Sequence, residues 1–322
     1  MPKKILTVGS LTFDFFATPA RQKILTESSE KFLAVPFGGK VRAENAHRTF
    51  GGSASNCAAN FAQFQIPVAA FGAVGADEES EAVLQNLQNR GIDSRFVQKI
   101  RGEKTGFSII LNSDCGERTV LFAKGANEKI EKIPAAVLSQ FHGIHLGHLS
   151  GKSAAIFAGI EKFFGKNPDH FLSWNPGREQ IEKGVEFFAK FLPAVDALFL
   201  NLEEAQKLSG EKKPPDIFAK LKRNNFRGIL AVTDGRRGAD IFSEKENFHL
   251  GIFEQFSRVD ALGAGDAFAS AASAQLFRGE KNLQKVFKIA TISAASVVSK
   301  FGAQAGLLPE KKLRKLAESF DF

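Results

Sequence analysis

Short apolar runs alternate with helical patterns along almost the whole chain. The apolar runs are candidate strands, and we place them at Ile5–Val8, Val68–Val74, Gly143–Leu146, Phe171–Trp174, Ala197–Leu200 and Ile229–Val232. Loops and candidate helices follow the runs, with the helices expected at Ser53–Phe64, Glu78–Asn89, Ser153–Phe164, Arg178–Lys190, Leu202–Leu208, Ala264–Phe277 and Asn282–Lys300. This alternation is typical of βαβ units. We therefore predict an α/β fold in which a doubly wound, mostly parallel sheet is flanked by helices on both faces.

Two regions interrupt this alternation. Residues 13–50 are too many for a loop between a strand and a helix, and residues 105–123 alternate in polarity as a β-hairpin does. We interpret both regions as a small β-rich lid over one edge of the sheet. The sequence shows no internal repeat, low-complexity tract or interdomain linker. We therefore predict that residues 1–322 form a single domain that includes the lid.

The composition is that of a globular protein. Of the 322 residues, 43% are hydrophobic and 24% are charged. No apolar run has the length of a membrane span, and residues 1–6 lack the apolar core of a secretory signal. We therefore expect a cytoplasmic protein with no membrane partner. Cys57 and Cys115 form no C-x-x-C pair, so we expect two buried thiols and no metal or redox site there.

The formal net charge of +8 raises the question of a nucleic-acid partner. The basic residues at 211–213, 222–223 and 311–315 are dispersed, and they are interleaved with Glu and apolar positions. This pattern favours solvated helix faces over a nucleic-acid-binding patch. We expect no nucleic-acid partner and only a minor role of the charge in attracting anionic nucleotides.

The segment Asp260-Ala261-Leu262-Gly263-Ala264-Gly265-Asp266 leads directly into a candidate helix of small residues. The backbone amides of Gly263, Ala264 and Gly265 can approach an anion closely, and the helix directs its positive end to the same point. Such amides stabilise a phosphoryl group in transfer, while the Asp266 carboxylate takes the proton of an acceptor hydroxyl. The helix N-terminus is also expected to keep Asp266 ionised. The alternative is a Gly-rich loop whose acidic residue only complements the helix dipole.

Two segments near the N-terminus are candidates for the acceptor side. Asp14 follows the first predicted strand, and a carboxylate there can accept hydrogen bonds from two neighbouring hydroxyls. Gly51 and Gly52 open a helix, where glycine permits close backbone approach, and Asn56 offers both a donor and an acceptor. The alternatives are a plain turn residue at position 14 and a tightly packed helix start at 51–56.

Two further loops after predicted strands are candidates for the nucleotide side. Asn201 and Glu204 have the N-x-x-E spacing that puts both side chains on one side of a first helical turn, where they can organise water around Mg²⁺. The same spacing is that of a simple capping box. The segment Thr233-Asp234-Gly235-Arg236-Arg237-Gly238 suits nucleotide phosphates. Its alternative is an exposed polar turn.

Three other patterns argue against different functions. The segment from Gly147 to Ser153 resembles a P-loop but has three residues between its glycines where four are needed. His142, His145 and His148 are not expected to bind a metal, because side chains alternate along a strand and His145 would face away from the other two. We interpret them as structural or substrate-side histidines. A G-x-G-x-x-G segment is absent after the first strand, which counts against a dehydrogenase.

Taken together, the motifs resemble the ribokinase-like (PfkB) carbohydrate kinase family, from Ile5 to about Leu308. The D-x-x-G-A-G-D segment at Asp260–Asp266 is the strongest element of the resemblance. Five other segments occur along the chain in the same order as in the family. They are Gly51-Gly52 with Asn56, Gly75-Ala76-Asp77, Gly125-Ala126-Asn127, Asn201 with Glu204, and Gly302-Ala303.

The resemblance implies a doubly wound α/β domain with a lid that often forms a dimer interface. It also implies ATP, Mg²⁺ and transfer of the γ-phosphoryl to a hydroxymethyl group of a small sugar. By position, Asp266 would be the base and Gly263–Gly265 the anion hole, while Glu204 would bind Mg²⁺ waters. The ATP contacts would come from Asn201 and from Thr233, Asp234, Gly235, Arg236, Arg237 and Gly238. The substrate contacts would come from Asp14, Gly52 and Asn56.

Some members of this family bind a monovalent cation such as K⁺ beside the anion hole. The positions that match are Asp260, Leu262 and the loop 300–306. Ala261 stands where the family usually has Thr or Ser, and Asp234 replaces a commonly apolar residue. These departures concern the cation site and the nucleotide preference and leave the reaction type unchanged.

Three alternatives to a sugar kinase are open. A nucleoside kinase on the same fold could stack a base on the phenylalanines that flank Asp14, which are Phe13, Phe15 and Phe16. A sugar-phosphate kinase would need a cluster of cations under the lid, and the candidates are Lys40, Arg42, Arg118 and Lys124. A non-catalytic sugar-binding regulator would have no need of Asp266 as a base.

Overall fold

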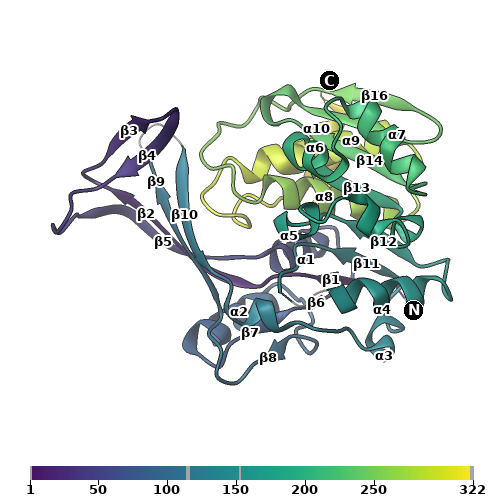
Figure 1. Ribbon diagram of the computed structural model, residues 1–322, viewed down its shortest axis with the longest axis horizontal. Helices are drawn as coiled ribbons and strands as arrows, with labels where there is room; N and C mark the ends of the chain where they lie inside the picture. Colours follow the sequence, from purple (N-terminus) through teal and green to yellow (C-terminus); the bar gives the residue numbers. More distant parts are fainter. Residues whose placement is uncertain (1, 114–116, 152–153, 320–322) are drawn as a thin grey trace.

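A central eight-stranded sheet dominates the computed structural model, which describes residues 2–113, 117–151 and 154–319 (Figure 1). The spatial order of its strands is β16-β15-β14-β13-β12-β11-β1-β6. The six strands from β6 to β14 in this order are parallel, and β15 and β16 are antiparallel strands at one edge. The strands are β1 (Ile5–Val8), β6 (Val68–Phe71), β11 (Gly143–Leu146), β12 (Phe171–Trp174), β13 (Ala197–Asn201), β14 (Ile229–Thr233), β15 (Ala239–Phe242) and β16 (Asn247–Leu250). The predicted doubly wound, mostly parallel sheet is confirmed.

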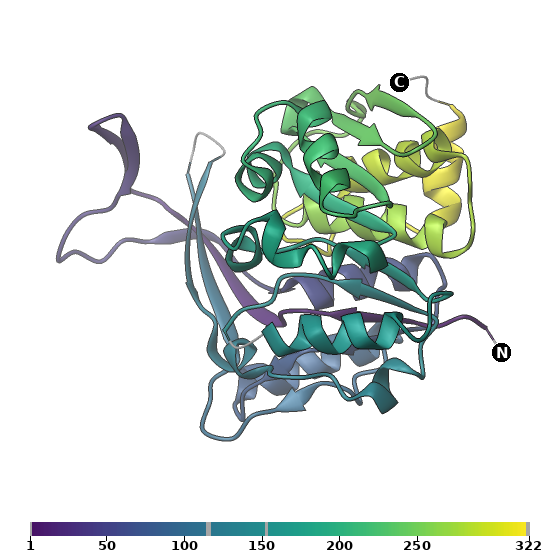
Figure 2. The ribbon, with the colours of Figure 1, turned by 45° about the vertical axis from the view of Figure 1, so that its right-hand side comes forward.

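Helices pack against both faces of the sheet (Figures 1 and 2). One layer contains α3 (Ala135–Leu138), α4 (Ala154–Phe164), α5 (Arg178–Ile181), α6 (Leu202–Ser209) and α7 (Pro214–Arg223). The other contains α1 (Ser53–Gln63), α2 (Glu78–Asn89), α8 (Ala264–Phe277), α9 (Leu283–Val297) and α10 (Glu310–Glu318). Short 3₁₀ turns lie at η1 (Gly125–Lys129), η2 (Val185–Phe188), η3 (Leu192–Ala194) and η4 (Gly235–Arg237).

Small side chains let α1 and α8 pack closely on the same face of the sheet. The buried amide of Asn60 on α1 donates hydrogen bonds to the carbonyl of Ala267 (3.0 Å) and to Oγ of Ser270 (2.8 Å), both on α8. Bulky side chains between two helices would hold their backbones too far apart for such bonds. The close packing brings the N-terminal turns of α1 and α8 together, and these turns carry Asn56 and Asp266.

A separate four-stranded sheet projects from one end of the molecule (Figure 1). We call it the lid sheet, and its order is β10-β9-β2-β5. Its strands are β2 (Thr12–Pro19), β5 (Ala43–Gly51), β9 (Gly106–Asn112) and β10 (Arg118–Ala123). The hairpin of β3 (Lys23–Glu27) and β4 (Glu30–Ala34) lies farther from the helices in both ribbon views (Figure 2). The short strands β7 (Ala73–Val74) and β8 (Gln98–Lys99) form a small parallel pair.

The predicted helix Arg178–Lys190 is wrong. Helix α5 ends at Ile181, and the 3₁₀ turn η2 follows at Val185–Phe188. Gly184 between them has a φ of 75°, which takes the chain out of the helical conformation. Within the described residues, no helix has both the length and the apolar content that crossing a lipid bilayer requires.

Candidate active site

The predicted site residues gather where the strands β1, β11, β13 and β14 end. Parallel strands end at the same edge of a sheet, and in open α/β sheets ligands bind beyond that edge. We call it the carboxyl edge. The N-terminal turns of α1, α6 and α8 reach it from the helix layers, and the lid sheet begins directly beyond β1.

The backbone at the start of α8 requires glycine at one position. Gly263 is the N-cap residue and has a φ of 77°, and a Cβ there would lie 2.4 Å from Cβ of Ala303. Gly265 is exposed, and a Cβ at this position would have no atom within 4 Å. The first N–H groups of a helix have no acceptor within the helix. The predicted anion hole is therefore a glycine-led helix start with open space at Gly265.

Asp266 stands on the first turn of α8 and is held by α1. Nδ2 of Asn56 donates a hydrogen bond to Oδ2 of Asp266 at 2.8 Å. The oxygen of the same amide accepts a hydrogen bond from Nε2 of Gln304 at 3.1 Å. Our sequence analysis placed Asn56 at the substrate, whereas in the structure both ends of its amide are engaged by Asp266 and Gln304. Asn56 thus orients the carboxylate that we predicted to be the base.

Two opposing effects set the ionisation of Asp266. Burial raises the pKa of this carboxyl, and the positive charge of His148 and the hydrogen bond from Asn56 partly offset the rise. The helix N-terminus favours the carboxylate, as expected from the sequence, but burial acts in the opposite direction. A carboxylate with a raised pKa is a stronger proton acceptor. Cys57, one of the two predicted buried thiols, is fully buried beneath this turn, and Cys115 lies outside the described residues.

Asp14 lies on β2 and is buried, with 4% of its surface exposed. Burial raises the pKa of its carboxyl, and the hydroxyls of Ser108 and Thr12 lower it in part. Its buried oxygen Oδ1 has no hydrogen-bond partner among the described residues. The same holds for the buried hydroxyl of Thr49, which pairs with Asp14 across β2 and β5. Buried polar atoms without partners are rare in folded proteins, and these two lie on one face of the lid sheet.

The two glycines predicted at the acceptor side lie between β5 and α1, and Gly51 is in close contact with Asp14. A Cβ at Gly51 would lie 2.0 Å from Oδ2 of Asp14. Gly52 has a φ of 87° and is the N-cap residue of α1, and a Cβ there would lie 2.4 Å from the carbonyl oxygen of Ser10. Position 52 therefore requires glycine, whereas a side chain at position 51 would displace Asp14. The two glycines connect Asp14 to the first turn of α1 and so to Asn56.

A cavity of about 560 Å³ opens beside the start of α8. Six of the predicted residues line it: Thr233, Gly235, Arg236, Gly238, Ala264 and Gly265. Its other walls are mostly apolar and come from residues 252–258, α8 and α9, among them Phe253, Phe256, Phe268, Ala294 and Ala295. Sequence reasoning missed these walls, because apolar residues at helical spacing look the same whether they face a core or a cavity.

Asp234 and Arg237 form an ion pair with each other. Nε and Nη2 of Arg237 donate to the two carboxylate oxygens of Asp234 at 2.6 and 2.8 Å. The Arg237 side chain is largely exposed, and neither residue lines the cavity. Of the two predicted guanidinium groups, only that of Arg236 reaches the cavity.

Asn201 and Glu204 form a reciprocal capping box at the start of α6. Oδ1 of Asn201 accepts from the N–H of Glu204, and Oε2 of Glu204 accepts from the N–H of Asn201, both at 2.9 Å. Burial raises the pKa of Glu204, and the negative charge of Asp266 contributes to the rise. The two carboxylates are therefore within electrostatic reach of each other. Neither Asn201 nor Glu204 lines the cavity.

The carboxylates near α8 suit Mg²⁺ bound mainly through water. Asp266 and Glu204 offer oxygen atoms, which Mg²⁺ prefers, and Mg²⁺ usually keeps several waters and takes few protein ligands. Among residues 2–113, 117–151 and 154–319, no cluster of three acidic, histidine or cysteine side chains could hold a metal by itself. Phosphates and water would have to complete the coordination.

Asp260 is buried and joins three segments. Its Oδ1 accepts from the N–H of Leu262 (3.0 Å) and from Nη1 of Arg118 (3.3 Å), and its Oδ2 accepts from the N–H of Gly302 (3.1 Å). Arg118 belongs to β10, so this carboxylate links the lid sheet to the loop that precedes α8. Both oxygens of Asp260 are therefore already engaged by donors, and Arg118 brings a positive charge to the position that matches a cation site.

Of the three histidines around β11, only His145 is buried. His145 is fully buried, and its Nδ1 lies 2.8 Å from Oγ of Ser173. Burial lowers the pKa of His145 to about 3. His142 and His148 are exposed at opposite ends of the strand. In the P-loop-like segment, Lys152 and Ser153 lie outside the described residues.

The sheet order, the lid sheet and the cavity at the carboxyl edge define a ribokinase-like α/β protein. The structure of Arabidopsis thaliana ribokinase with ribose and ATP matches with a TM-score of 0.80 at 21% identity, over the whole of both chains. A Burkholderia thailandensis nucleoside kinase in complex with inosine matches with a TM-score of 0.79 at 15% identity, over 98% of each chain.

Sequence comparison identifies the family. The profile of the pfkB family carbohydrate kinases matches residues 3–311, and the chain belongs to this family. An ATP-dependent ribose-1-phosphate kinase of Halopiger xanaduensis is 26% identical over 88% of this chain and 92% of its own length. A ribokinase of Staphylococcus aureus is 24% identical over 95% of this chain and 97% of its own length.

Proposed function

We propose that this carbohydrate kinase transfers the γ-phosphoryl of ATP to a hydroxymethyl group of a small sugar, with Asp266 as the base. The position of Asp266 carries the proposal. This carboxylate is held by Asn56 on the first turn of α8, and the same turn contributes Ala264 and Gly265 to the cavity. On its other side, the N-terminal turn of α1 connects it to Asp14.

The cavity supports the assignment of ATP as the donor. Its volume and its apolar walls fit a base and a ribose, and its lining includes Arg236 and the helix start at Gly265, both of which suit phosphates. ATP is also named in the description of one relative and bound in one solved structure of the same fold. Mg²⁺, when bound, would neutralise charge on the phosphates, and Glu204 would hold its waters.

The proposed reaction is a direct transfer between oxygens. Asp266 accepts the proton of the acceptor hydroxyl while the hydroxyl oxygen forms a bond to the γ-phosphorus. The bond from that phosphorus to the bridging oxygen breaks, and ADP leaves with the electron pair. The amides of Gly263, Ala264 and Gly265 bind the charge on the phosphoryl oxygens.

The unpartnered oxygens on the lid sheet support a polyhydroxyl acceptor. Oδ1 of Asp14 and the hydroxyl of Thr49 are both buried without partners, and sugar hydroxyls can supply the missing hydrogen bonds. Loop residue Gly302 packs against Thr49 and donates to Asp260, so this face of the lid sheet lies next to the loop before α8. The acceptor would lie between Asp14 and Asp266.

A nucleoside is the second candidate acceptor, and one aromatic side chain favours it. Ser108 pairs with Asp14 on one neighbouring strand and with Phe122 on the other, so the three side chains lie on one face of the lid sheet. The surface of Phe122 is 66% exposed. A nucleobase can stack on such a ring. The phenylalanines named from the sequence are less suitable, because Phe16 is fully buried and Phe13 stacks on Phe107 on the opposite face.

Two of the four cations named for a sugar-phosphate acceptor are paired with other carboxylates. Arg118 bonds to Asp260, and Lys124 pairs with Glu179. Lys40 and Arg42 lie in the segment between β4 and β5. A sugar phosphate is therefore less well supported than a neutral sugar, although one relative is described as a ribose-1-phosphate kinase.

Three further expectations stay predictions. Binding of K⁺ at Asp260 would be opposed by the positive charge of Arg118 at that carboxylate. A homodimer would form through the lid sheet, whose outer face carries exposed apolar side chains. The cytoplasm is the expected location.

A turnover assay with a panel of acceptors tests the proposed function. We expect ADP release from ATP and Mg²⁺ to depend on one or a few pentoses or hexoses. Dependence on nucleosides alone would favour the second candidate. Sugar binding in calorimetry without turnover of any acceptor would favour a non-catalytic regulator and contradict the proposal.

A further inference from the structure

His148 stands at the carboxyl edge with its backbone held from one side by α1. It is the second residue beyond β11, and the reaction described above does not use it. Its N–H donates a hydrogen bond to Oγ of Ser53 at 2.9 Å. The N–H of Ser53 in turn donates to Oγ of Ser10, in the loop after β1, at 3.0 Å. Ser53 is the first residue of α1, and Asn56 lies on the same turn. The first turn of α1 therefore contacts the backbone of His148 and also carries Asn56.

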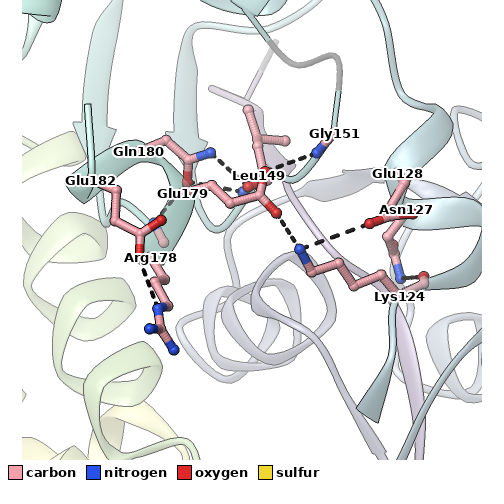
Figure 3. A network of polar contacts seen from close by, with 10 residues as sticks. Lys124, Asn127, Glu128, Leu149, Gly151, Arg178, Glu179, Gln180 and Glu182 are labelled. Carbon is pink, nitrogen blue, oxygen red and sulfur yellow. Dashed lines mark hydrogen bonds and ion pairs between the residues drawn. The ribbon is translucent and has the colours of Figure 1, made fainter.

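The next residues of the chain are held from the other side by α5 (Figure 3). The buried amide of Gln180 accepts from the N–H of Leu149 at 3.3 Å and donates to its carbonyl at 2.6 Å. Glu179 accepts from the N–H of Gly151 at 3.0 Å and pairs with Lys124 at the end of β10. The backbone around His148 is thereby fixed between α1, α5 and the base of the lid sheet.

The imidazole itself is exposed, and no hydrogen bond from a described residue reaches it. A Cβ at Gly177 would lie 3.0 Å from Cβ and 3.1 Å from Cγ of His148, so the side chain packs against backbone on this side. A fixed backbone and an exposed ring are the features expected of a side chain that meets a ligand.

Two carboxylates on other elements lie near His148. The N–H of His148 is bonded to Ser53 at the start of α1, and Asn56 on the first turn of α1 is bonded to Asp266 on α8. In agreement with this placement, His148 lowers the pKa of Asp266 and that of Glu204 on α6. In the proposed function these two groups are the base and the holder of Mg²⁺ waters. A phosphoryl group in transfer would pass between them.

We infer that His148 is a catalytic residue whose imidazole N–H donates a hydrogen bond to an oxygen of the phosphoryl group in transfer. The inference rests on the proposed function. His148 forms no covalent bond in this role, and its proton stays on the ring. A donor directed at charge that develops in the transition state lowers the barrier more than it strengthens substrate binding.

Substitution of His148 separates this role from a structural one. We expect His148→Ala to lower kcat at least about tenfold while the KM of the acceptor changes less than about threefold. His148→Asn or His148→Gln, whose amide N–H groups stand close to Nδ1 or Nε2, should restore part of kcat. His142→Ala, at the other end of β11, is the matched control and should keep full activity. An unchanged kcat, or a rise in acceptor KM alone, would overturn the inference.

Binding of a transition-state mimic gives a readout without turnover. We expect His148→Ala to weaken the calorimetric affinity for ADP with aluminium fluoride, Mg²⁺ and acceptor at least about tenfold, with the affinity for ADP alone within about twofold. Equal losses for both ligands, or no loss, would contradict the inference. A wild-type protein that phosphorylates no acceptor would refute the proposed function itself, whereas an active wild type with unaffected His148 variants refutes only this role.

Discussion

Gly51 shows how a single hydrogen atom in place of a side chain can shape the acceptor side. A Cβ at this position would lie 2.0 Å from Oδ2 of Asp14, which is closer than any two such atoms can approach. Asp14 would have to leave its position, where burial and the hydroxyls of Thr12 and Ser108 now define its environment. The position of the carboxylate therefore depends on the absence of a side chain at position 51.

We predict that Gly51→Ala raises the KM of the acceptor at least about tenfold and leaves the KM of ATP within about twofold. Steady-state kinetics with each substrate varied in turn measures both values. Gly159→Ala on α4 is the control, because a Cβ there has no atom within 4 Å. An unchanged acceptor KM in Gly51→Ala would show that Asp14 does not bind the acceptor.

The buried His145 should make the free energy of unfolding depend on pH. Its pKa is about 3 in the folded protein and about 6.5 in an unfolded chain, so the unfolded state binds the additional proton between these values. The free energy of unfolding must therefore decrease as the pH falls below 6.5. We expect His145 to lower the free energy of unfolding by about 2 kcal/mol when the pH falls from 7 to 5.

Urea unfolding at pH 7 and pH 5 measures this contribution. In His145→Gln the decrease in unfolding free energy should be smaller than in the wild type by about that amount. His249→Gln, at an exposed histidine, should behave like the wild type. If His145→Gln shows the same decrease as the wild type, His145 is not the group that titrates.

At the scale of elements, the contact between Arg118 and Asp260 joins the lid sheet to the loop before α8. Asp260 is buried, and Arg118 is its only side-chain donor among the described residues. A buried carboxylate that loses its cation keeps the cost of its desolvation. Loss of the arginine would therefore disturb both the position of β10 and the loop that ends in Gly263.

We predict that Arg118→Ala lowers kcat/KM for the acceptor about tenfold, with a smaller loss in Arg118→Lys. Arg95→Ala serves as the control, because Arg95 forms an exposed ion pair with Asp93 away from the carboxyl edge. Initial rates at low acceptor concentration report kcat/KM directly. A value equal to that of the wild type would mean that the lid sheet is positioned without this contact.

The regular elements were largely predictable from the sequence. Strands β1, β11 and β12 have the predicted bounds, because short apolar runs between polar loops leave little choice of boundary. The helix predicted at Arg178–Lys190 is wrong, because a helical pattern does not reveal that Gly184 adopts a positive φ. The antiparallel strands β15 and β16 were not predicted, because they do not follow the alternation of strand and helix on which the prediction was based.

The site was predictable where polar groups follow strands, and less so where contacts are tertiary. Asp266 and Asp14 stand out in the sequence, but nothing local indicates that Asn56 bonds to Asp266, 210 residues away. The pairing of Asp234 with Arg237 is likewise visible only in the structure. The walls of the cavity were missed, because Phe253 and Ala294 carry no chemistry that distinguishes them from core residues.

At the scale of the whole molecule, the lid sheet presents two different faces. The face with Asp14 and Ser108 is the one that we propose binds the acceptor, and the opposite face carries Ile109 and Leu121. These two side chains are 37% and 53% exposed. Exposed apolar side chains that adjoin on a sheet are typical of an interface. We propose that two copies of the chain pack through this face.

Light scattering after size-exclusion chromatography tests the assembly. We predict a dimer for the wild type and a monomer for Leu121→Asp, because a charge at the centre of an apolar interface is costly to bury. Phe187→Asp, at an exposed phenylalanine on the body of the protein, should remain a dimer. A monomeric wild type, or a dimeric Leu121→Asp variant, would contradict the proposed interface.

The most direct test of the account is the phosphoryl-transfer rate of Asp266→Asn. The asparagine has nearly the same shape and can still accept the hydrogen bond from Asn56, but it cannot take a proton from the acceptor. We predict that kcat falls about a thousandfold while the calorimetric affinity for ATP stays within a few-fold of the wild type. A variant that transfers phosphate at a rate near that of the wild type would show that Asp266 is not the base.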